Sequence, residues 1–186
     1  MEKRRQKHNE RLMYLTGILV VVRVLISKSL NQEIGPYGIV SNIGEAVSAT
    51  VFIGWLYCKY LWRCEFFKWE SIPRLHKRYN GILKSSYDGI ERKTNLEIKQ
   101  TLLSVEVKLI SDESSSDSVN ATISEIHGQK TLLYTYLNEP MSAHRHHSQI
   151  HYGTAKLSII SDRELRGTYY TDRNTTGDMF LSALEE

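Results

Sequence analysis

The sequence contains little cysteine: of its 186 residues, only Cys58 and Cys64 are cysteines. On a helix, a spacing of six residues turns the two side chains well away from each other, which argues against an internal disulfide. Two cysteines without a C-x-x-C spacing also make a poor zinc site. We therefore expect neither a disulfide framework nor a structural zinc.

Catalytic motifs are also missing. The chain contains no G-x-S-x-G nucleophile elbow, no P-loop and no H-E-x-x-H sequence. Carboxylates are plentiful, but no pair of them is placed for acid–base work. We therefore interpret the chain as a protein other than an enzyme, and we expect no cofactor.

Two polar segments resemble metal sites without their full ligand sets. His144, His146, His147 and His151 lie mostly in a long polar loop, with no cysteine or carboxylate at ligand spacing. The segment SDESSSDS, from Ser111 to Ser118, lacks the glycine and the terminal glutamate of an EF-hand. We expect an exposed histidine loop and a solvated polar loop, and no bound metal.

Positive charge is modest overall, at a net +3, but its distribution is uneven. One basic cluster occupies residues 1–11, and a second lies between Lys59 and Arg78. Basic clusters beside apolar stretches are typical of membrane topology signals, so we expect no DNA or RNA partner. The average of 41% hydrophobic residues hides two unlike halves, because the apolar runs end near residue 62 and the rest is polar and rich in tyrosine.

The apolar runs predict a two-helix transmembrane hairpin over residues 12–62. The run Leu12–Ile26 resembles the core of a signal peptide, but no small-residue cleavage site follows it. The run Ile39–Leu61 is long enough to cross about 30 Å of hydrocarbon, which takes about 20 helical residues. Gly35-Pro36 between the runs favours a tight turn.

Flanking charge predicts the orientation of this hairpin. The tail 1–11 and the connector 63–77 are both basic, whereas the turn between the helices carries only Glu33. The positive-inside rule then places both termini in the cytoplasm. The inner membrane interface would be marked by an aromatic set that consists of Trp55, Tyr57, Tyr60 and Trp62.

Polar and small residues within the predicted spans suggest helix contacts. Arg23 and Glu45 both lie roughly 10–12 Å below the outer surface, so an ion pair across the hairpin or between copies would reduce the cost of burying them. The alternative is that the helices are tilted and Arg23 snorkels. Ala46, Thr50 and Gly54 recur every four residues and form a small-residue stripe, which allows close packing within one hairpin or between copies.

Residues 78–186 predict an all-β domain. Short strands at even spacing, separated by turn residues, are typical of a barrel or sandwich, and about 110 residues in eight strands fit a small antiparallel up-and-down barrel. Such a barrel holds packed side chains or one small ligand. The predicted strands are Tyr79–Tyr87, Thr94–Thr101, Ser104–Ile110, Val119–Ile126, Lys130–Leu137, Ile150–Ile160, Glu164–Tyr170 and Asp178–Leu184.

Two alternating sets of polar and aromatic residues are candidates for a ligand site. If the strand continues through GTYYTDRNTTG, four side chains project from one face, and YTYLN supplies a second set. Guanidinium, hydroxyl and tyrosine groups suit a phosphate-bearing ligand with a stackable ring, although Tyr and Thr also favour strands for packing reasons alone. The candidates are Tyr169, Thr171, Arg173 and Thr175, with Tyr134, Tyr136 and Asn138.

Over almost its whole length, the chain resembles the transmembrane β-barrel effectors of bacterial CBASS antiphage systems. Five features carry the resemblance: Gln100, the serine-rich turn around Ser114 and Ser116, YTYLNEP (134–140), HYGTAKL (151–157) and GTYYTDRNTTGDM (167–179). The resemblance implies that a neighbouring nucleotidyltransferase makes a cyclic dinucleotide during infection and that the barrel binds it. Self-association of the anchored helices into homo-oligomers then damages the bacterial inner membrane, and the cell dies before the phage matures.

On this resemblance, the seven candidates above bind the nucleotide, while Arg23, Glu45 and the small-residue stripe take part in helix association. Two alternatives remain open. A membrane-tethered carrier of a lipid would have an apolar barrel interior without arginine. A barrel that only binds a partner protein would be plugged and would show a large apolar outer patch.

Overall fold

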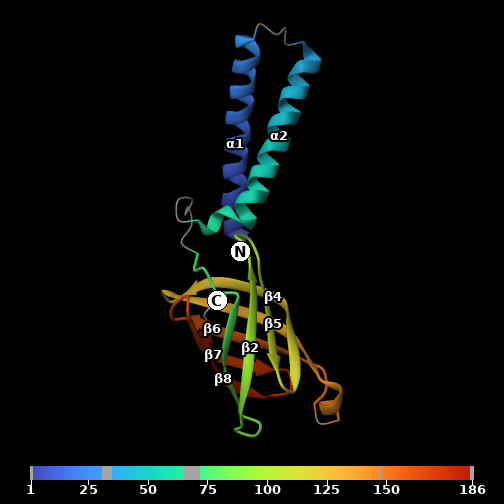
Figure 1. Ribbon diagram of the computed structural model, residues 1–186, viewed down its shortest axis with the longest axis vertical. Helices are drawn as coiled ribbons and strands as arrows, with labels where there is room; N and C mark the ends of the chain where they lie inside the picture. The colour runs from blue at the N-terminus through green and yellow to red at the C-terminus, as the bar shows by residue number, and fades with distance from the viewer. Residues whose placement is uncertain (1, 31–34, 65–71, 147, 185–186) are drawn as a thin grey trace. The chain divides into compact units, whose positions relative to one another are not determined.

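The computed structural model describes residues 2–30, 35–64, 72–146 and 148–184 (Figure 1). The chain divides into two compact units, Met1–Trp69 and Glu70–Glu186.

The first unit is a helical hairpin. Helix α1 spans Glu2–Ser29 and α2 spans Pro36–Lys59, followed by a short 3-10 helix, η1, at Leu61–Arg63. Proline suits the first turn of α2, because no intrahelical partner exists there for the missing N–H. Both helices are long and apolar enough to cross a membrane, judged by length and composition. The predicted pair of apolar helices is therefore confirmed, and α1 extends back through the basic tail.

The small-residue stripe faces α1 of the same chain. Ala46, Thr50 and Gly54 are all buried, and the hydroxyl oxygens of Thr16 and Thr50 lie 3.1 Å apart. A Cβ added at Gly54 would lie 2.8 Å from a methyl carbon of Leu12, so the glycine permits close approach of the helices. The stripe is thus occupied within the hairpin, and contact with another copy through it would first require the helices to separate.

Arg23 and Glu45 pair across the hairpin. The Arg23 Nε donates to Glu45 Oε2 at 2.8 Å, and the Ser41 hydroxyl lies 3.5 Å from the other carboxylate oxygen. The two charged side chains keep 36% and 55% of their surface exposed. Of the two predicted arrangements, the structure contains the one within a single chain.

The second unit is a closed barrel of eight antiparallel strands in sequential order, as predicted. Each strand pairs with the next along the chain, and the last pairs with the first, so that Tyr79 lies opposite Ala183. The strands are β1 Arg78–Ser85, β2 Glu91–Gln100, β3 Val105–Ser111, β4 Ser114–Ile126, β5 Gln129–Pro140, β6 His151–Ile159, β7 Glu164–Thr171 and β8 Thr176–Ala183.

Two predicted loops are shorter than expected. The segment 111–118 was predicted to be a solvated loop, but β4 begins at Ser114, and Ser116 pairs with Asn138 of β5. For the same reason β5 continues to Pro140, into the predicted loop 138–149. The hydropathy pattern misses these strand ends because their inward side chains are small and polar rather than apolar.

One end of the barrel is filled and closed. Side chains such as Leu132, Leu157 and Leu165 are fully buried there. The end of the connector also packs against this core: Leu75 is 2% exposed, and its N–H donates to Gln100 Oε1 at 3.0 Å. The Gln100 amide nitrogen in turn donates to the Pro73 carbonyl at 2.9 Å. Gln100, one of the features of the family resemblance, therefore lies at the closed end.

Candidate ligand-binding site

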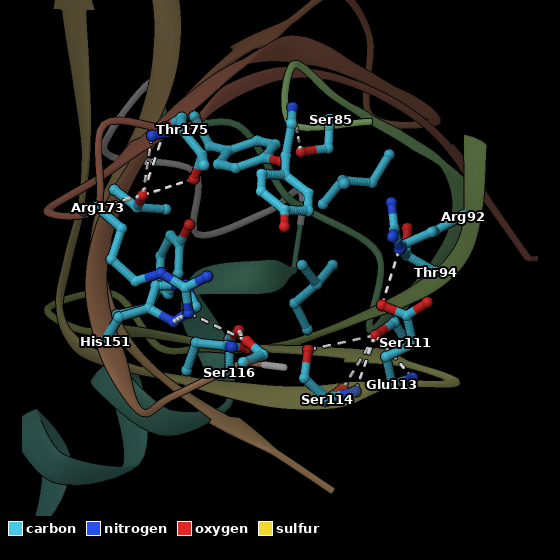
Figure 2. A pocket seen from close by; sticks show the side chains of 18 of the residues that line it. Ser85, Arg92, Thr94, Ser111, Glu113, Ser114, Ser116, His151, Arg173 and Thr175 are labelled. Carbon is cyan, nitrogen blue, oxygen red and sulfur yellow. Dashed lines mark hydrogen bonds and ion pairs between the residues drawn. The ribbon is translucent and has the colours of Figure 1, made fainter. Parts of the chain in front are cut away.

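A cavity of about 320 Å³ opens at the other end of the barrel, where β1, β3, β5 and β7 end and their partners begin (Figure 2). The inward positions change character along the strands, from large apolar residues to small polar ones. The polar residues are buried but leave the interior hollow. They are Ser85, Thr94, Ser116, Asn138 and Thr171.

The turn between β7 and β8 forms one wall of the cavity. The strand does not continue through this segment, since β7 ends at Thr171 and β8 begins at Thr176, close to the predicted strands Glu164–Tyr170 and Asp178–Leu184. The Thr171 and Thr175 hydroxyls, whose oxygens lie 2.6 Å apart, stabilise the turn, and Asn174 adopts the left-handed backbone (φ 59°) that asparagine tolerates in turns. All four candidates from this segment nevertheless line the cavity, because the turn folds over the barrel mouth.

Arg173 projects from this turn toward neutral partners. Its Nη1 donates to the Ser148 hydroxyl at 3.1 Å and to the Gln149 carbonyl at 3.2 Å, and it lies 3.4 Å from His151 Nδ1. Among the residues that the structure describes, no carboxylate pairs with Arg173. Its positive charge therefore remains uncompensated at the cavity, which suits an anionic ligand.

Two tyrosine rings lie across the cavity wall, each opposite a glycine on a neighbouring strand. Tyr136 pairs with Gly153, and Tyr169 pairs with Gly177. A Cβ at either glycine would lie 2.4 Å from an atom of the opposite ring, so the rings occupy space that only glycine leaves open. Burial, and secondarily the nearby Tyr169, raises the pKa of Tyr136 well above its usual range, so its phenol remains a neutral donor.

Tyr134 does not line the cavity, contrary to its predicted role. Its side chain is 2% exposed within the core, and its ring centroid lies 5.8 Å from that of Tyr136. Alternation correctly predicts that Tyr134, Tyr136 and Asn138 share the inward face. A rise of about 3.3 Å per residue, however, places Tyr134 roughly 7 Å deeper than Tyr136, below the cavity floor.

A second guanidinium, from Arg92 on β2, lines the cavity on the side opposite Arg173 (Figure 2). Its Nη2 lies 2.6 Å from Asp88 Oδ2, and its Nε lies 2.9 Å from Glu113 Oε2, so it ties the β1–β2 loop to the β3–β4 turn. The hydrogen bond from Arg92 lowers the pKa of Asp88 to about 2. Sequence inspection missed Arg92 because it lies in the charged run ERK, which is typical of a solvated strand.

Thr94, two residues further along β2, is 3% exposed, and its hydroxyl has no hydrogen-bond partner among the described residues. Since Thr94 also lines the cavity, this hydroxyl is a buried polar group placed beside a vacant volume. Buried hydroxyls are almost always paired, so an unpaired one beside a cavity indicates a contact to a ligand or to water.

His144 and His151 line the cavity rim, together with Ser148. The interpretation of the histidines as a purely exposed loop was therefore wrong for these two, while His147 lies outside the described residues. No group of three or more potential metal ligands occurs in the part of the chain that the structure describes. The histidines instead belong to the polar rim around Arg173.

A barrel closed at one end, whose open end gathers guanidinium groups, tyrosine rings and hydroxyls, has the groups that a small phosphate-bearing ligand requires. Residues 70–183 match the family model described as Cap15, cyclic dinucleotide receptor domain. CD-NTase-associated protein 15 of Staphylococcus schleiferi is 33% identical over 177 residues, which cover 94% of this chain and 96% of that protein. A protein of the same name from Yersinia aleksiciae is 27% identical over 195 residues, covering 97% and 93%. The chain belongs to the Cap15 family of CBASS effectors, as the sequence resemblance predicted.

Proposed function

We propose that the barrel cavity binds a cyclic dinucleotide and that this binding triggers the helical hairpin to damage the membrane. The observation that carries the proposal is the content of the cavity. It combines an arginine that no described carboxylate neutralises, two tyrosine rings and several buried hydroxyls. A cyclic dinucleotide presents two phosphates and two bases, and therefore requires cationic donors and aromatic faces.

Each cavity residue has a role that fits its position. Arg173 contacts a phosphate, and the rings of Tyr136 and Tyr169 contact the bases. The hydroxyl of Thr94 supplies a hydrogen bond that the free protein leaves unmade. Further hydrogen bonds to the sugar–phosphate ring come from the remaining predicted residues, Asn138, Thr171 and Thr175. The volume of about 320 Å³ lies within the usual range of small-molecule sites.

The two arginines of the cavity weigh against a lipid carrier. A carrier would need an apolar interior without arginine, whereas Arg92 and Arg173 both line this cavity. The apolar part of the interior is filled by side chains such as Leu132 and Leu157. Apolar cargo therefore has no space at the closed end and would lie against two guanidinium groups at the open one.

The hairpin supplies the effector step. Both helices cross the bacterial inner membrane. Basic residues before the first span and at the end of the second, such as Arg11 and Lys59, hold the termini and the barrel in the cytoplasm. A ligand that binds better to an associating conformation shifts the population toward homo-oligomers. Association of the hairpins then breaks membrane integrity and causes abortive infection, with no enzymatic step.

The test is a calorimetric titration of the full chain in lipid nanodiscs. The panel contains cyclic di-GMP, cyclic di-AMP, cyclic GMP–AMP and cyclic di-UMP. Arg173→Ala should weaken the tightest binding about 10- to 100-fold, because a hydrogen bond to a charged group contributes about 1.5–3 kcal/mol. The matched control is Arg166→Ala, on the exposed face of β7, which should bind like the unaltered chain. Absence of binding by folded protein, or equal binding by Arg173→Ala, would contradict the proposed site.

A further inference from the structure

A polar stripe runs along the exposed side of α2. Ser41, Glu45 and Ser48 follow one another at spacings of four and three residues, which places them within about 60° around the helix axis. All three are exposed. Arg23 joins the stripe from α1 through its ion pair with Glu45. We call these four residues the polar stripe.

The polar stripe is not the face by which the two helices pack together. That contact uses the buried Asn42, Ala46, Thr50 and Gly54, which lie on another side of α2. Among the described residues, Arg23 is the one side chain of α1 that bonds to Ser41, Glu45 or Ser48, although these three lie within a segment of membrane-spanning length. Charged and polar groups at membrane depth face a bundle interior or water, and they commonly mark ion pathways.

The same face changes character toward the other end of α2. It continues with Phe52 and Trp55, whose ring centroids lie 6.1 Å apart. A face that is polar at one end and aromatic at the other resembles the lining of channels, where charged positions select ions and apolar positions narrow the passage.

We propose that several copies of this chain surround a water-filled pore lined by the polar stripe, and that Arg23 and Glu45 determine which ions pass. This inference rests on the proposed function and specifies its last step. Membrane damage is then conduction through a passage of limited width, rather than general disorder of the bilayer. The occupant of the exposed stripe is water, held between copies of the same helix.

The first test is cysteine accessibility in proteoliposomes. In a Cys58→Ala, Cys64→Ser background, Ser48→Cys is compared with Val47→Cys, a neighbour that is also exposed in the hairpin but lies off the stripe. The tightest binder from the nucleotide panel activates both proteins, and a membrane-impermeant cationic thiosulfonate is then added. We expect modification of Ser48→Cys to reduce the conductance at least several-fold, with Val47→Cys unaffected. Equal responses of the two variants would overturn the pore.

The second test is ion selectivity. Under a KCl gradient, Glu45→Gln should shift the reversal potential toward anion preference, because Arg23 then stands alone, and Arg23→Gln should shift it in the opposite direction. Trapped dyes of graded size should show a cut-off. Unshifted potentials together with release of large dextrans would overturn the pore but leave nucleotide-triggered damage intact.

Calorimetry on the same variants distinguishes a failure of the pore from a failure of nucleotide binding. Variants that bind nucleotide like the unaltered chain but conduct differently support the pore. If the unaltered chain binds nucleotide and releases nothing, both the pore and the effector step are wrong. If it binds no nucleotide, the receptor site itself is wrong.

Discussion

The two ends of the barrel are built from the same strands with the same alternation, yet they do different work. At the closed end the inward residues are large and apolar, and Leu75 of the connector completes the packing. At the open end most inward residues are small and polar, and the rings of Tyr136 and Tyr169 lie along the wall, which leaves a cavity between them. Stability therefore concentrates at one end and recognition at the other, and the division follows from side-chain size and polarity alone.

The largest effect is expected from removing core volume at the closed end. Leu132 is fully buried, so Leu132→Ala should lower the free energy of unfolding by about 2–5 kcal/mol. The exposed Val119 on β4 provides the control, since Val119→Ala should change it by less than about 0.5 kcal/mol. Urea unfolding of the full chain in detergent micelles measures both values, and similar costs would show that the closed end is not the core.

A smaller effect on stability is expected at Gly153, which lies against the Tyr136 ring. Gly153→Ala places a Cβ against the Tyr136 ring, which must move, so we expect a loss of about 1–3 kcal/mol in stability and weaker nucleotide binding. In a Tyr136→Leu background the same change should cost little, because the ring is gone. A double-mutant cycle by urea unfolding measures the coupling. If the stability costs of the two substitutions are additive, the glycine is not required to accommodate the tyrosine ring.

Two buried threonines, one near the closed end and one at the cavity, should differ in their effects on stability and on binding. The Thr131 hydroxyl donates to the Gln129 carbonyl at 3.2 Å near the closed end, whereas the Thr94 hydroxyl has no partner among the described residues. Thr131→Val should therefore cost about 1 kcal/mol of stability, and Thr94→Val should gain a similar amount. In nucleotide titrations the affected variant is the other one. Thr94→Val should bind nucleotide about 10-fold more weakly, whereas Thr131→Val should bind it with unchanged affinity. Equal binding by both variants would remove Thr94 from the site.

The smallest effect concerns pH at the cavity rim. The hydrogen bond from Arg92 lowers the pKa of Asp88 to about 2, below an unfolded value of about 3.9. This contribution to stability is therefore fully present above about pH 4 and is lost as the pH falls through about 2. Asp88→Asn should flatten this part of the stability profile, as measured by urea midpoints at pH 5 and pH 3. An unchanged slope would show that the ion pair does not stabilise the rim.

The sequence predicted the parts of this molecule whose patterning is strong. The alternation of Val105, Val107 and Leu109 is apolar on one side only, so the strand and its inward face were predictable. Ser114 and Ser116 were not, because an inward serine at a barrel mouth has the same hydropathy as a serine in a loop. The missed strand ends lie at the cavity, because a binding site replaces the apolar residues on which strand prediction depends.

The sequence did not predict how deep each side chain lies in the barrel or which side chains reach the cavity. Tyr134 and Tyr136 share one face, but only the barrel floor decides which of them meets a ligand. Arg92 lies in a charged run, and its position at the cavity depends on pairing with Asp88 and Glu113, whose loops come together only in the closed barrel. Arg173 was predictable because its neighbours Thr171 and Thr175 already suggested a polar cluster.

Closure of the barrel by its first and last strands has a consequence for biosynthesis. Tyr79 of β1 can pair early with Leu96 of β2, but it meets its second partner only when Ala183 of β8 has left the ribosome. Contacts so distant in the sequence form late, whereas the N-terminal hairpin is synthesised first and folds from local contacts. The turn that carries Arg173 is also made near the end of synthesis. A nascent or truncated chain therefore lacks the closed barrel and the complete cavity until translation is almost finished.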